Sequence, residues 1–332
     1  MSSEHIFVTG ASGFLGSHVV LQLLENGYCC GPRGKRQISS SLPTQATASG
    51  VEVVKITDIA HDQFPEALAG VDAIIHIATP APGRAEPSAM LATAVEGTLN
   101  VVGQGERAGI MRMVVTSSIA SVVNPKDSFT DRDWNPITKE TALTGENKLA
   151  TYSASKKFAE IALWEWADKH PHVEVTTLNP PIFYGPFTPH FPLPVPDFRA
   201  ISTDRVFYNY LFPDGVFSYR TYYIDVRDVA QAHGRKRIII SSPFGWSFQK
   251  TRDFIAEQRP ALRERLITAT PLEPPFNVMP INFERVEEVL GMKVSDFHTT
   301  EQTILDTVDA LIQAEEQWVK AGHPIKTPPL LP

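Results

Sequence analysis

The chain has 332 residues, of which 42% are hydrophobic and 20% are charged, and its formal net charge is −7. That length allows about two domains, and the composition excludes a disordered or collagen-like chain. An acidic chain without a basic block is a poor candidate for binding nucleic acid or an anionic membrane surface, and no apolar run approaches the ~20 residues that span a bilayer.

The first 180 residues alternate short apolar stretches with longer segments of helical periodicity. Strands are predicted at residues 5–10, 28–30, 51–56, 71–78, 111–117, 173–178 and 237–242. Helices are predicted at residues 14–26, 64–69, 88–108, 151–170 and 300–321. Because strands that alternate with helices at this spacing indicate βαβ units, the expected fold class is α/β with a Rossmann-type, doubly wound parallel sheet.

The character of the sequence changes near residue 180. Residues 180–223 hold many of the 27 prolines and a dense set of aromatic residues, which is typical of a loop-rich segment. We therefore expect a dinucleotide-binding Rossmann domain of residues 1–180 and 221–242. Residues 181–220 and 243–332 are expected to form a smaller, mostly helical C-terminal substrate lobe.

The two cysteines, Cys29 and Cys30, are adjacent and cannot form an unstrained disulfide. The sequence has no Asn-x-Ser/Thr sequon, and residues 1–5 lack the basic start of a signal peptide. These features favour a reducing compartment, and we expect a cytoplasmic protein. We expect no metal site, because His170 and His172 have no further ligand nearby in the sequence.

Three glycines follow the first predicted strand at a G-x-x-G-x-x-G spacing. Gly10 permits a tight turn, Gly13 lets the backbone approach a diphosphate, and Gly16 lets the helix pack close to the sheet. The phosphates would lie at the helix N-terminus, where free N–H groups favour anions. A glycine-rich turn that binds nothing is the alternative. The cofactor-binding residues predicted in this loop are Gly10, Ser12, Gly13, Phe14, Leu15 and Gly16.

The choice of dinucleotide is expected to depend on residues 31–36, which follow the second strand. NAD-selective proteins carry an acidic residue there, but this segment has no carboxylate and three cations. A ribose 2′-phosphate is the natural partner of such a segment, with Arg33 or Lys35 as its ligand. The sequence therefore favours NADP over NAD, with a solvated basic loop as the alternative.

Tyr152 and Lys156 are four residues apart in a predicted helix, so both side chains lie on one face. A nearby ammonium lowers the pKa of a phenol, as a general acid for carbonyl reduction requires. Such a pair alone is weak evidence, because a surface helix can carry it by chance. Ser117 and Ser118 follow a predicted strand, and ligands bind at the carboxyl ends of parallel strands. The order of glycine loop, serine and Tyr-x-x-x-Lys is far more specific than any one of them.

These motifs together resemble the extended short-chain dehydrogenase/reductases. Within them, the chain is most similar to the branch of dihydroflavonol reductase, cinnamoyl-CoA reductase and the fungal methylglyoxal- and aldehyde-reducing enzymes. The resemblance spans roughly residues 5–322 and rests on residues 9–16, 58–59, 71–76, 116–118, 152–156, 179–181, 223–230 and 288–291.

The resemblance implies a role for each matching residue. Tyr152 would donate the proton, and Lys156 would lower its pKa and bind the nicotinamide ribose. Ser118, in preference to Ser117, would polarise the substrate carbonyl. Further cofactor contacts are implied beside the adenine (Asp58 and Ile59), along the cofactor cleft (Ala78, Thr79 and Pro80) and near the nicotinamide (Pro180, Ile182 and Phe183).

One departure from the family pattern concerns the helix that should begin near Asp225. In the family it runs on for several turns, whereas residues 232–237 lead almost at once into the next apolar stretch. About a dozen residues are absent by comparison. Since that helix normally braces the sheet and borders the substrate lobe, the shortening calls the stability of this region and the closure of the pocket into question.

The sequence favours an NADPH-dependent reductase of aldehydes or ketones. The alternatives are a nucleotide-sugar epimerase or hydroxysteroid dehydrogenase of the same superfamily, and a non-enzymatic NADP-sensing regulator. The substrate is expected to be a small carbonyl compound, apolar or aromatic, because the lobe has many rings and no cluster of cations for a diphosphate. Phe183, Tyr184 and Phe187 are expected to reach the pocket, and the protein is expected to be a monomer or a weak homodimer.

Overall fold

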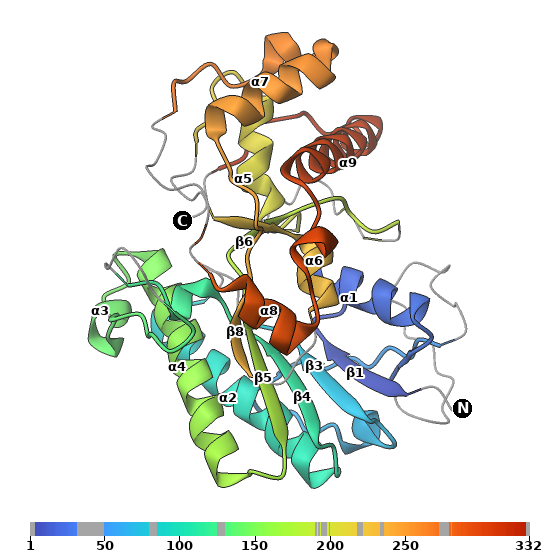
Figure 1. Ribbon diagram of the computed structural model, residues 1–332, viewed down its shortest axis with the longest axis vertical. Helices are drawn as coiled ribbons and strands as arrows, with labels where there is room; N and C mark the ends of the chain where they lie inside the picture. Colours follow the sequence, from blue (N-terminus) through green and yellow to red (C-terminus); the bar gives the residue numbers. More distant parts are fainter. Residues whose placement is uncertain are drawn as a thin grey trace.

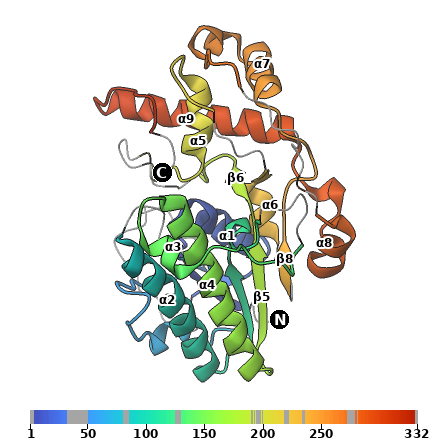
Figure 2. The ribbon, with the colours of Figure 1, turned by 90° about the vertical axis from the view of Figure 1, so that its left-hand side faces the viewer.

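The computed structural model describes residues 4–31, 50–79, 85–124, 130–189, 191, 193, 198, 200–217, 222–232, 236–271, 279 and 281–329. A parallel sheet flanked by helices forms one part of the molecule, and a mostly helical lobe lies beyond one end of its strands (Figures 1 and 2). Arg33, Lys35 and Pro80 lie outside the described residues.

In the part of the chain that the structure describes, the main sheet has six strands in the order β2-β1-β3-β4-β5-β8, and every neighbouring pair is parallel. The strands are β1 (His5–Thr9), β2 (Cys29–Cys30), β3 (Ala73–His76), β4 (Arg112–Thr116), β5 (Glu174–Asn179) and β8 (Arg237–Ile239). The Rossmann-type sheet predicted from the sequence is thus confirmed.

The strand predicted at residues 51–56 is wrong. Only Val51 pairs with the sheet, through an isolated bridge to Cys30, and the following residues form no ladder. The physical reason is exposure at the sheet edge: Val54 is 38% exposed, and the neighbouring Lys55 is also exposed. Alternating polar and apolar residues there gain too little burial to extend the strand.

Helices cover both faces of the sheet, because neighbouring strand residues point to opposite sides. Ile6 and Ile75 pack toward α1 (Phe14–Glu25), α6 (Val226–Gln231) and α8 (Phe283–Leu290). Phe7 and Ile74 pack toward α2 (Pro87–Arg107) and α4 (Lys148–Lys169). The short α3 (Lys139–Leu143) packs against α4. This two-sided cover is the doubly wound arrangement expected from the sequence.

In the described residues, the lobe contains α5 (Asp204–Tyr208), α7 (Phe248–Gln258), α9 (Thr300–Lys320) and a parallel pair of strands, β6 (Ile182–Tyr184) and β7 (Tyr223–Asp225). β7 pairs with the lobe strand β6 although it lies in residues 221–242, which the sequence assigned to the dinucleotide-binding domain. Rings fill the core of the lobe, including Phe207, Tyr208, Trp246 and Trp318. Tyr184 belongs to this core, with 3% exposure and its ring 5.4 Å from that of Trp246. The expectation that Tyr184 lines the pocket is therefore wrong, because burying its ring among other rings is more favourable.

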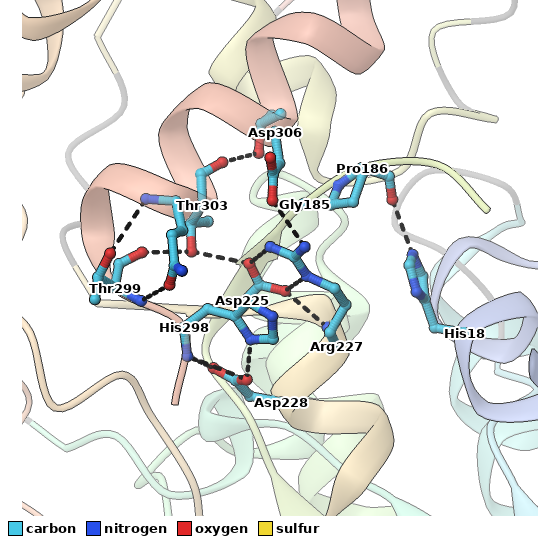
Figure 3. Close-up of polar contacts among 12 residues, drawn as sticks. His18, Gly185, Pro186, Asp225, Arg227, Asp228, His298, Thr299, Thr303 and Asp306 are labelled. Atoms are coloured by element: carbon cyan, nitrogen blue, oxygen red, sulfur yellow. Dashed lines mark hydrogen bonds and ion pairs between the residues drawn. The ribbon is translucent and has the colours of Figure 1, made fainter. Parts of the chain in front are cut away.

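The helix after Asp225 is short, as the sequence predicted, since α6 has only six residues. A cluster of charges holds it in place, and we call this cluster the lobe junction (Figure 3). Asp225 caps α6 and pairs with Arg227 at 2.8 Å, and Arg227 also pairs with Asp306 of α9 at 2.7 Å. Asp228 of α6 pairs with His298 at 2.6 Å. The shortened helix is thus braced by ion pairs to α9 and to the segment that leads into α9.

Contacts to α1 brace α6 from the opposite side. The side chain of Gln22 donates a hydrogen bond of 2.9 Å to the carbonyl oxygen of Arg227. The imidazole of His18, also on α1, lies 2.8 Å from the carbonyl oxygen of Pro186 (Figure 3). The glycine-loop helix, α6 and the start of the lobe are therefore linked by hydrogen bonds.

Candidate active site

The glycine loop has the geometry of a diphosphate-binding turn. Gly10 has φ +74°, and a Cβ added there would lie 2.9 Å from the backbone nitrogen of Ala78. A Cβ on Gly16 would lie 2.0 Å from the carbonyl oxygen of Gly10, so the start of α1 can approach the loop only without a side chain. The loop is therefore built around close backbone contacts that other residues would prevent.

The N-terminus of α1 suits an anion. Its N-cap, Gly13, has no side chain to occupy the free N–H groups, and no acidic residue lies in the first turn within residues 4–31. Ser12 and Gly13 are exposed, whereas Phe14 and Leu15 are buried in the core. Ser12 and Gly13 are therefore accessible to a ligand, and Phe14 and Leu15 anchor the helix behind them.

Asp58 and Ile59, predicted to flank the adenine, lie in a turn after the bridge at the sheet edge. The exposed carboxylate of Asp58 accepts a hydrogen bond from the backbone of Ala60 and lies 2.9 Å from His61 Nδ1. The hydrogen bond with His61 lowers the pKa of Asp58. The carboxylate is therefore held within its own turn, and Ile59 is half-buried beside it.

Lys156 is buried on α4, and its Nζ donates a hydrogen bond of 3.0 Å to the carbonyl oxygen of Thr116 at the end of β4. Burial lowers the pKa of Lys156 to about 8, with the charge of Glu160 acting in the opposite direction. Lys156 lines a small cavity of about 20 Å³ together with Ala78 and Thr79, which the sequence assigned to the cofactor cleft. The structure thus brings these three predicted residues together.

His76, at the carboxyl end of β3, lines the same cavity. Its Nδ1 lies 2.7 Å from the hydroxyl oxygen of Thr9, the last residue of β1. Burial, followed by the charge of Lys156, lowers the pKa of His76 to about 3. A neutral histidine therefore lies beside the buried ammonium at this edge of the sheet.

Tyr152 and Ser118 lie on elements that pack against each other. Tyr152 is half-buried on α4, one turn before Lys156, and α4 packs against a short 3-10 helix, residues Ile119–Ser121. Ser118 is the N-cap of this 3-10 helix, and its Oγ accepts a hydrogen bond of 3.2 Å from the backbone of Ala120. Among the described residues no acceptor takes the proton of this hydroxyl, which leaves the proton for a ligand.

Ser117 has a different role from Ser118. Its hydroxyl donates a hydrogen bond of 2.7 Å to the buried carboxylate of Glu160. A hydroxyl committed in this way has no second proton to donate to a substrate. The geometry thus favours Ser118, as the sequence analysis did.

The residues predicted near the nicotinamide continue from β5 into β6. The carbonyl oxygen of Pro180 accepts a hydrogen bond of 2.9 Å from the backbone of Ile119. Ile182 is buried in the lobe core. The ring of Phe183 lies 6.0 Å from that of Phe14, so it packs beside the glycine loop.

Glu160, which the sequence analysis did not single out, forms the centre of a buried polar network behind the site. Its side chain is 1% exposed and pairs with Arg237 of β8 at 2.9 Å. Its spacing in the sequence could have indicated this role, because Glu160 is one helical turn beyond Lys156 on the buried face of α4. A carboxylate on a buried helix face requires partners, and these are brought together only by the fold.

The structure combines a glycine loop, a buried lysine and a strand-end serine at the carboxyl edge of a parallel sheet. This combination defines a dinucleotide-binding protein of the Rossmann class. The signature of the NAD dependent epimerase/dehydratase family matches residues 6–235. The chain belongs to this family, the extended short-chain dehydrogenase/reductases, as its motifs predicted.

Individual relatives extend over most of the chain. A protein of Candida albicans named as an NADPH-dependent methylglyoxal reductase is 33% identical, with 94% of this chain and 99% of the relative covered. An oxidoreductase of Schizosaccharomyces pombe is 37% identical over 70% of this chain and 73% of its own.

Among solved structures, yeast methylglyoxal/isovaleraldehyde reductase Gre2 in complex with NADPH has a TM-score of 0.76 at 23% identity, covering 94% of this chain and 99% of that one. Alfalfa vestitone reductase has a TM-score of 0.71 at 23% identity, covering 95% and 99%. At this identity the likeness concerns the fold, and it supports the Rossmann-type architecture.

Proposed function

We propose that the protein is an NADPH-dependent reductase that converts aldehydes or ketones to alcohols. The observation that carries the proposal is the buried ammonium of Lys156, held at the carboxyl end of β4 one turn after Tyr152. Ser118 begins the short helix that packs against α4 at the same edge. Similarity to relatives named as oxidoreductases and NADPH-dependent reductases supports it.

The proposed mechanism assigns one task to each of three side chains. NADPH, when bound, supplies the hydride for the carbonyl carbon. Tyr152 donates its phenolic proton to the carbonyl oxygen, and Ser118 donates a hydrogen bond to the same oxygen. The ammonium of Lys156 stabilises the phenolate that remains on Tyr152. The fixed carbonyl of Thr116 holds Lys156 in place for this task.

The glycine loop would hold the cofactor diphosphate through Ser12, Gly13 and the N-terminus of α1. Ala78 and Thr79 line the cavity beside Lys156, and Phe183 packs against Phe14 beside the loop. Selection of NADP over NAD is assigned to the cationic segment 31–36, with Arg33 or Lys35 as the ligand of the 2′-phosphate. Asp58 and Ile59 beside the adenine, together with Pro80, Pro180 and Ile182, complete the proposed set.

A nucleotide-sugar epimerase is the less favoured function. Its substrate carries a diphosphate, which requires cations facing the cleft. Arg227 at the lobe junction and Arg259 and Arg265 in the lobe are each paired with a carboxylate, at 2.5–2.8 Å. These arginines are committed to the fold, so we propose an uncharged substrate, aromatic or aliphatic.

Other parts of the sequence prediction remain part of this proposal. They are the division into a dinucleotide-binding domain (1–180 and 221–242) and a substrate lobe (181–220 and 243–332), a cytoplasmic location, and a monomer or weak homodimer. No helix in the described ranges is long and apolar enough to cross a membrane. Both cysteines are free thiols, which agrees with a reducing compartment.

The proposal is tested by oxidation of NADPH in the presence of a panel of aldehydes, including methylglyoxal, a bulky aryl aldehyde and a short alkyl aldehyde. We expect turnover with at least one aldehyde. UDP-sugars are the control substrates. Because epimerisation causes no net oxidation of the cofactor, their conversion is followed by chromatography of the sugar nucleotide, and conversion of a UDP-sugar without any aldehyde turnover would contradict the proposed substrate class.

A further inference from the structure

The carboxylate of Glu160 joins α4 to three neighbouring segments. It accepts hydrogen bonds from Ser117 at 2.7 Å and from Ser121 at 2.6 Å, the two hydroxyls that flank Ser118 along the chain. On β5, Thr177 donates a bond of 2.7 Å and Asn179 one of 2.9 Å. One buried side chain thus fixes the residues on both sides of the proposed substrate-binding serine.

Arg237, on β8, is a further partner of Glu160 in this network. This guanidinium pairs with Glu160 and donates hydrogen bonds to the backbone oxygens of Asp131 and Asp133, at 2.6 Å and 2.8 Å. The ring of Trp134 lies 3.7 Å from the guanidinium carbon and shields the pair from solvent. A buried ion pair is poor evidence of stability, because an apolar replacement is often equally stable. Its position beside reacting groups is therefore the more informative feature.

We propose that Glu160 is a positioning residue for the reaction, whose carboxylate holds the turn that carries Ser118 against the helix that carries Tyr152 and Lys156. The inference rests on the proposed function of these three residues. Glu160 lies on the same helix as the proton donor, and its hydroxyl partners belong to the turn, so loss of the carboxylate would separate the two halves of the site.

Electrostatics adds a second consequence of the same geometry. Glu160, on the same helix, is the charged group that acts on Lys156, and the neutral His76 on β3 lines the same cavity. The charge of Glu160 favours the charged form of Lys156, whose pKa burial lowers to about 8. Removing that carboxylate would leave the effect of burial unopposed, so Lys156 would lose its proton at a lower pH.

Glu160→Gln is the direct test, because it keeps the shape of the side chain and removes its charge. We expect kcat for aldehyde reduction to fall at least ~10-fold, and the alkaline limb of its pH profile to move to lower pH. Affinity for NADPH should change far less, since no residue of the glycine loop contacts Glu160 in the described part of the chain.

Glu315→Gln is the matched control. Glu315 is also a buried glutamate that accepts from a hydroxyl, Tyr208, and pairs with an arginine, Arg265, but it lies on α9 in the lobe. It should lower the melting temperature by an amount comparable with Glu160→Gln and leave the pH profile in place. Equal pH profiles in both variants, with equal kcat, would overturn the proposal.

Ser121→Ala keeps the proposal falsifiable if Glu160→Gln does not fold. It removes the hydrogen bond from the turn to Glu160, together with the contacts of the same hydroxyl with the carbonyl oxygen of Ser118 and the amide of Asn179, and it leaves the ion pair with Arg237 intact. We expect a few-fold loss of kcat with no shift of the alkaline limb, because the charge remains; an unchanged kcat would contradict the positioning role. Tyr152→Phe, measured in parallel, distinguishes a failure of the proposed function from a failure of the proposal on Glu160. Full turnover by Tyr152→Phe would contradict the proposed function. An inactive Tyr152→Phe beside a fully active Glu160→Gln would contradict only the role of Glu160.

Discussion

Two clusters of charged groups differ in their surroundings: one is almost wholly buried, and the other is partly exposed. The catalytic edge, defined here by Ser118, Lys156 and Glu160, lies where the strands end beside the cofactor loop. In the lobe junction, Asp225 and Arg227 tie the short α6 to α9 (Figure 3). We propose that the first cluster shapes the reaction site, whereas the second links α6 to α9.

The comparison teaches that ion pairs alone do not locate an active site. At the lobe junction, Asp225 receives hydrogen bonds from Arg227 and Thr303, and Arg227 and Asp306 also line a cavity of about 400 Å³. At the catalytic edge, the ammonium of Lys156 is bonded to one carbonyl and faces a cavity. Substitutions should separate the two clusters, with losses of turnover at the first and losses of stability at the second.

The largest expected effect is that of Tyr152→Phe at the catalytic edge. This change removes the transferable proton and keeps the ring, so kcat should fall at least ~10²-fold while NADPH binding is nearly unchanged. Steady-state kinetics and a cofactor titration measure the two quantities. Normal turnover by this variant would show that the proton comes from another group.

At the lobe junction, Asp225→Asn should reduce the free energy of unfolding by about 2 kcal/mol, because it leaves the partly buried Arg227 with one carboxylate fewer. The kcat of the folded fraction should stay within about threefold of the parent value. Asp309→Asn is the control, since its ion pair with Arg259 is exposed and should contribute below ~1 kcal/mol. Equal stability losses in urea unfolding would remove the distinction between the two pairs.

A smaller effect is expected for the choice of cofactor, which we assign to residues 31–36. We expect NADPH to bind at least ten-fold more tightly than NADH, a difference of about 1.4 kcal/mol. Replacing Arg33 and Lys35 together with Ala should abolish this difference, because the 2′-phosphate loses its cations. Equal affinities of the unmodified protein for the two dinucleotides would contradict the prediction.

The smallest effect concerns the pH dependence of stability at the lobe junction. The hydrogen bond with Asp228 raises the pKa of His298 above its ordinary value of 6.5. A raised histidine pKa stabilises the fold fully below pH 6.5, and this contribution is lost as the pH rises through the pKa of the folded state. We expect a loss below about 1 kcal/mol that is absent in His298→Gln.

Urea unfolding of both proteins at several pH values above 6.5 measures this difference. Burial raises the pKa of Asp228 above the ordinary value of 3.8. The effect of Asp228 on stability therefore begins to change near pH 3.8, well below the pH range in which His298 loses its proton. Parallel pH curves for the parent and His298→Gln would mean that the histidine carries no charge in the junction.

The sequence was sufficient for the parts of the molecule that depend on local pattern. The apolar strands, the glycine spacing and the Tyr152–Lys156 helix follow from periodicity and from residues close together in the chain. The short α6 was also predicted from the sequence. The strand at 51–56 was predicted wrongly because its edge position, and hence its exposure, is a tertiary property.

The remainder depends on contacts between distant segments. Glu160 and Arg237 are 77 residues apart, and no local pattern pairs them. Tyr184 follows a sheet strand and was expected in the pocket, but ring packing with Phe207 and Trp246 places it in the lobe core. Which residues become partners of a buried group, when they are far apart in the sequence, depends on the fold.

The most direct test of the central claim follows the hydride itself. The protein would be given NADPH carrying deuterium at both C4 positions, together with an aldehyde that it turns over, and the alcohol would be analysed by mass spectrometry. If the protein is an NADPH-dependent carbonyl reductase, the alcohol carries one deuterium on the former carbonyl carbon, and Tyr152→Phe forms it at least ~10²-fold more slowly. An alcohol without deuterium, or no alcohol from any aldehyde, would contradict the account.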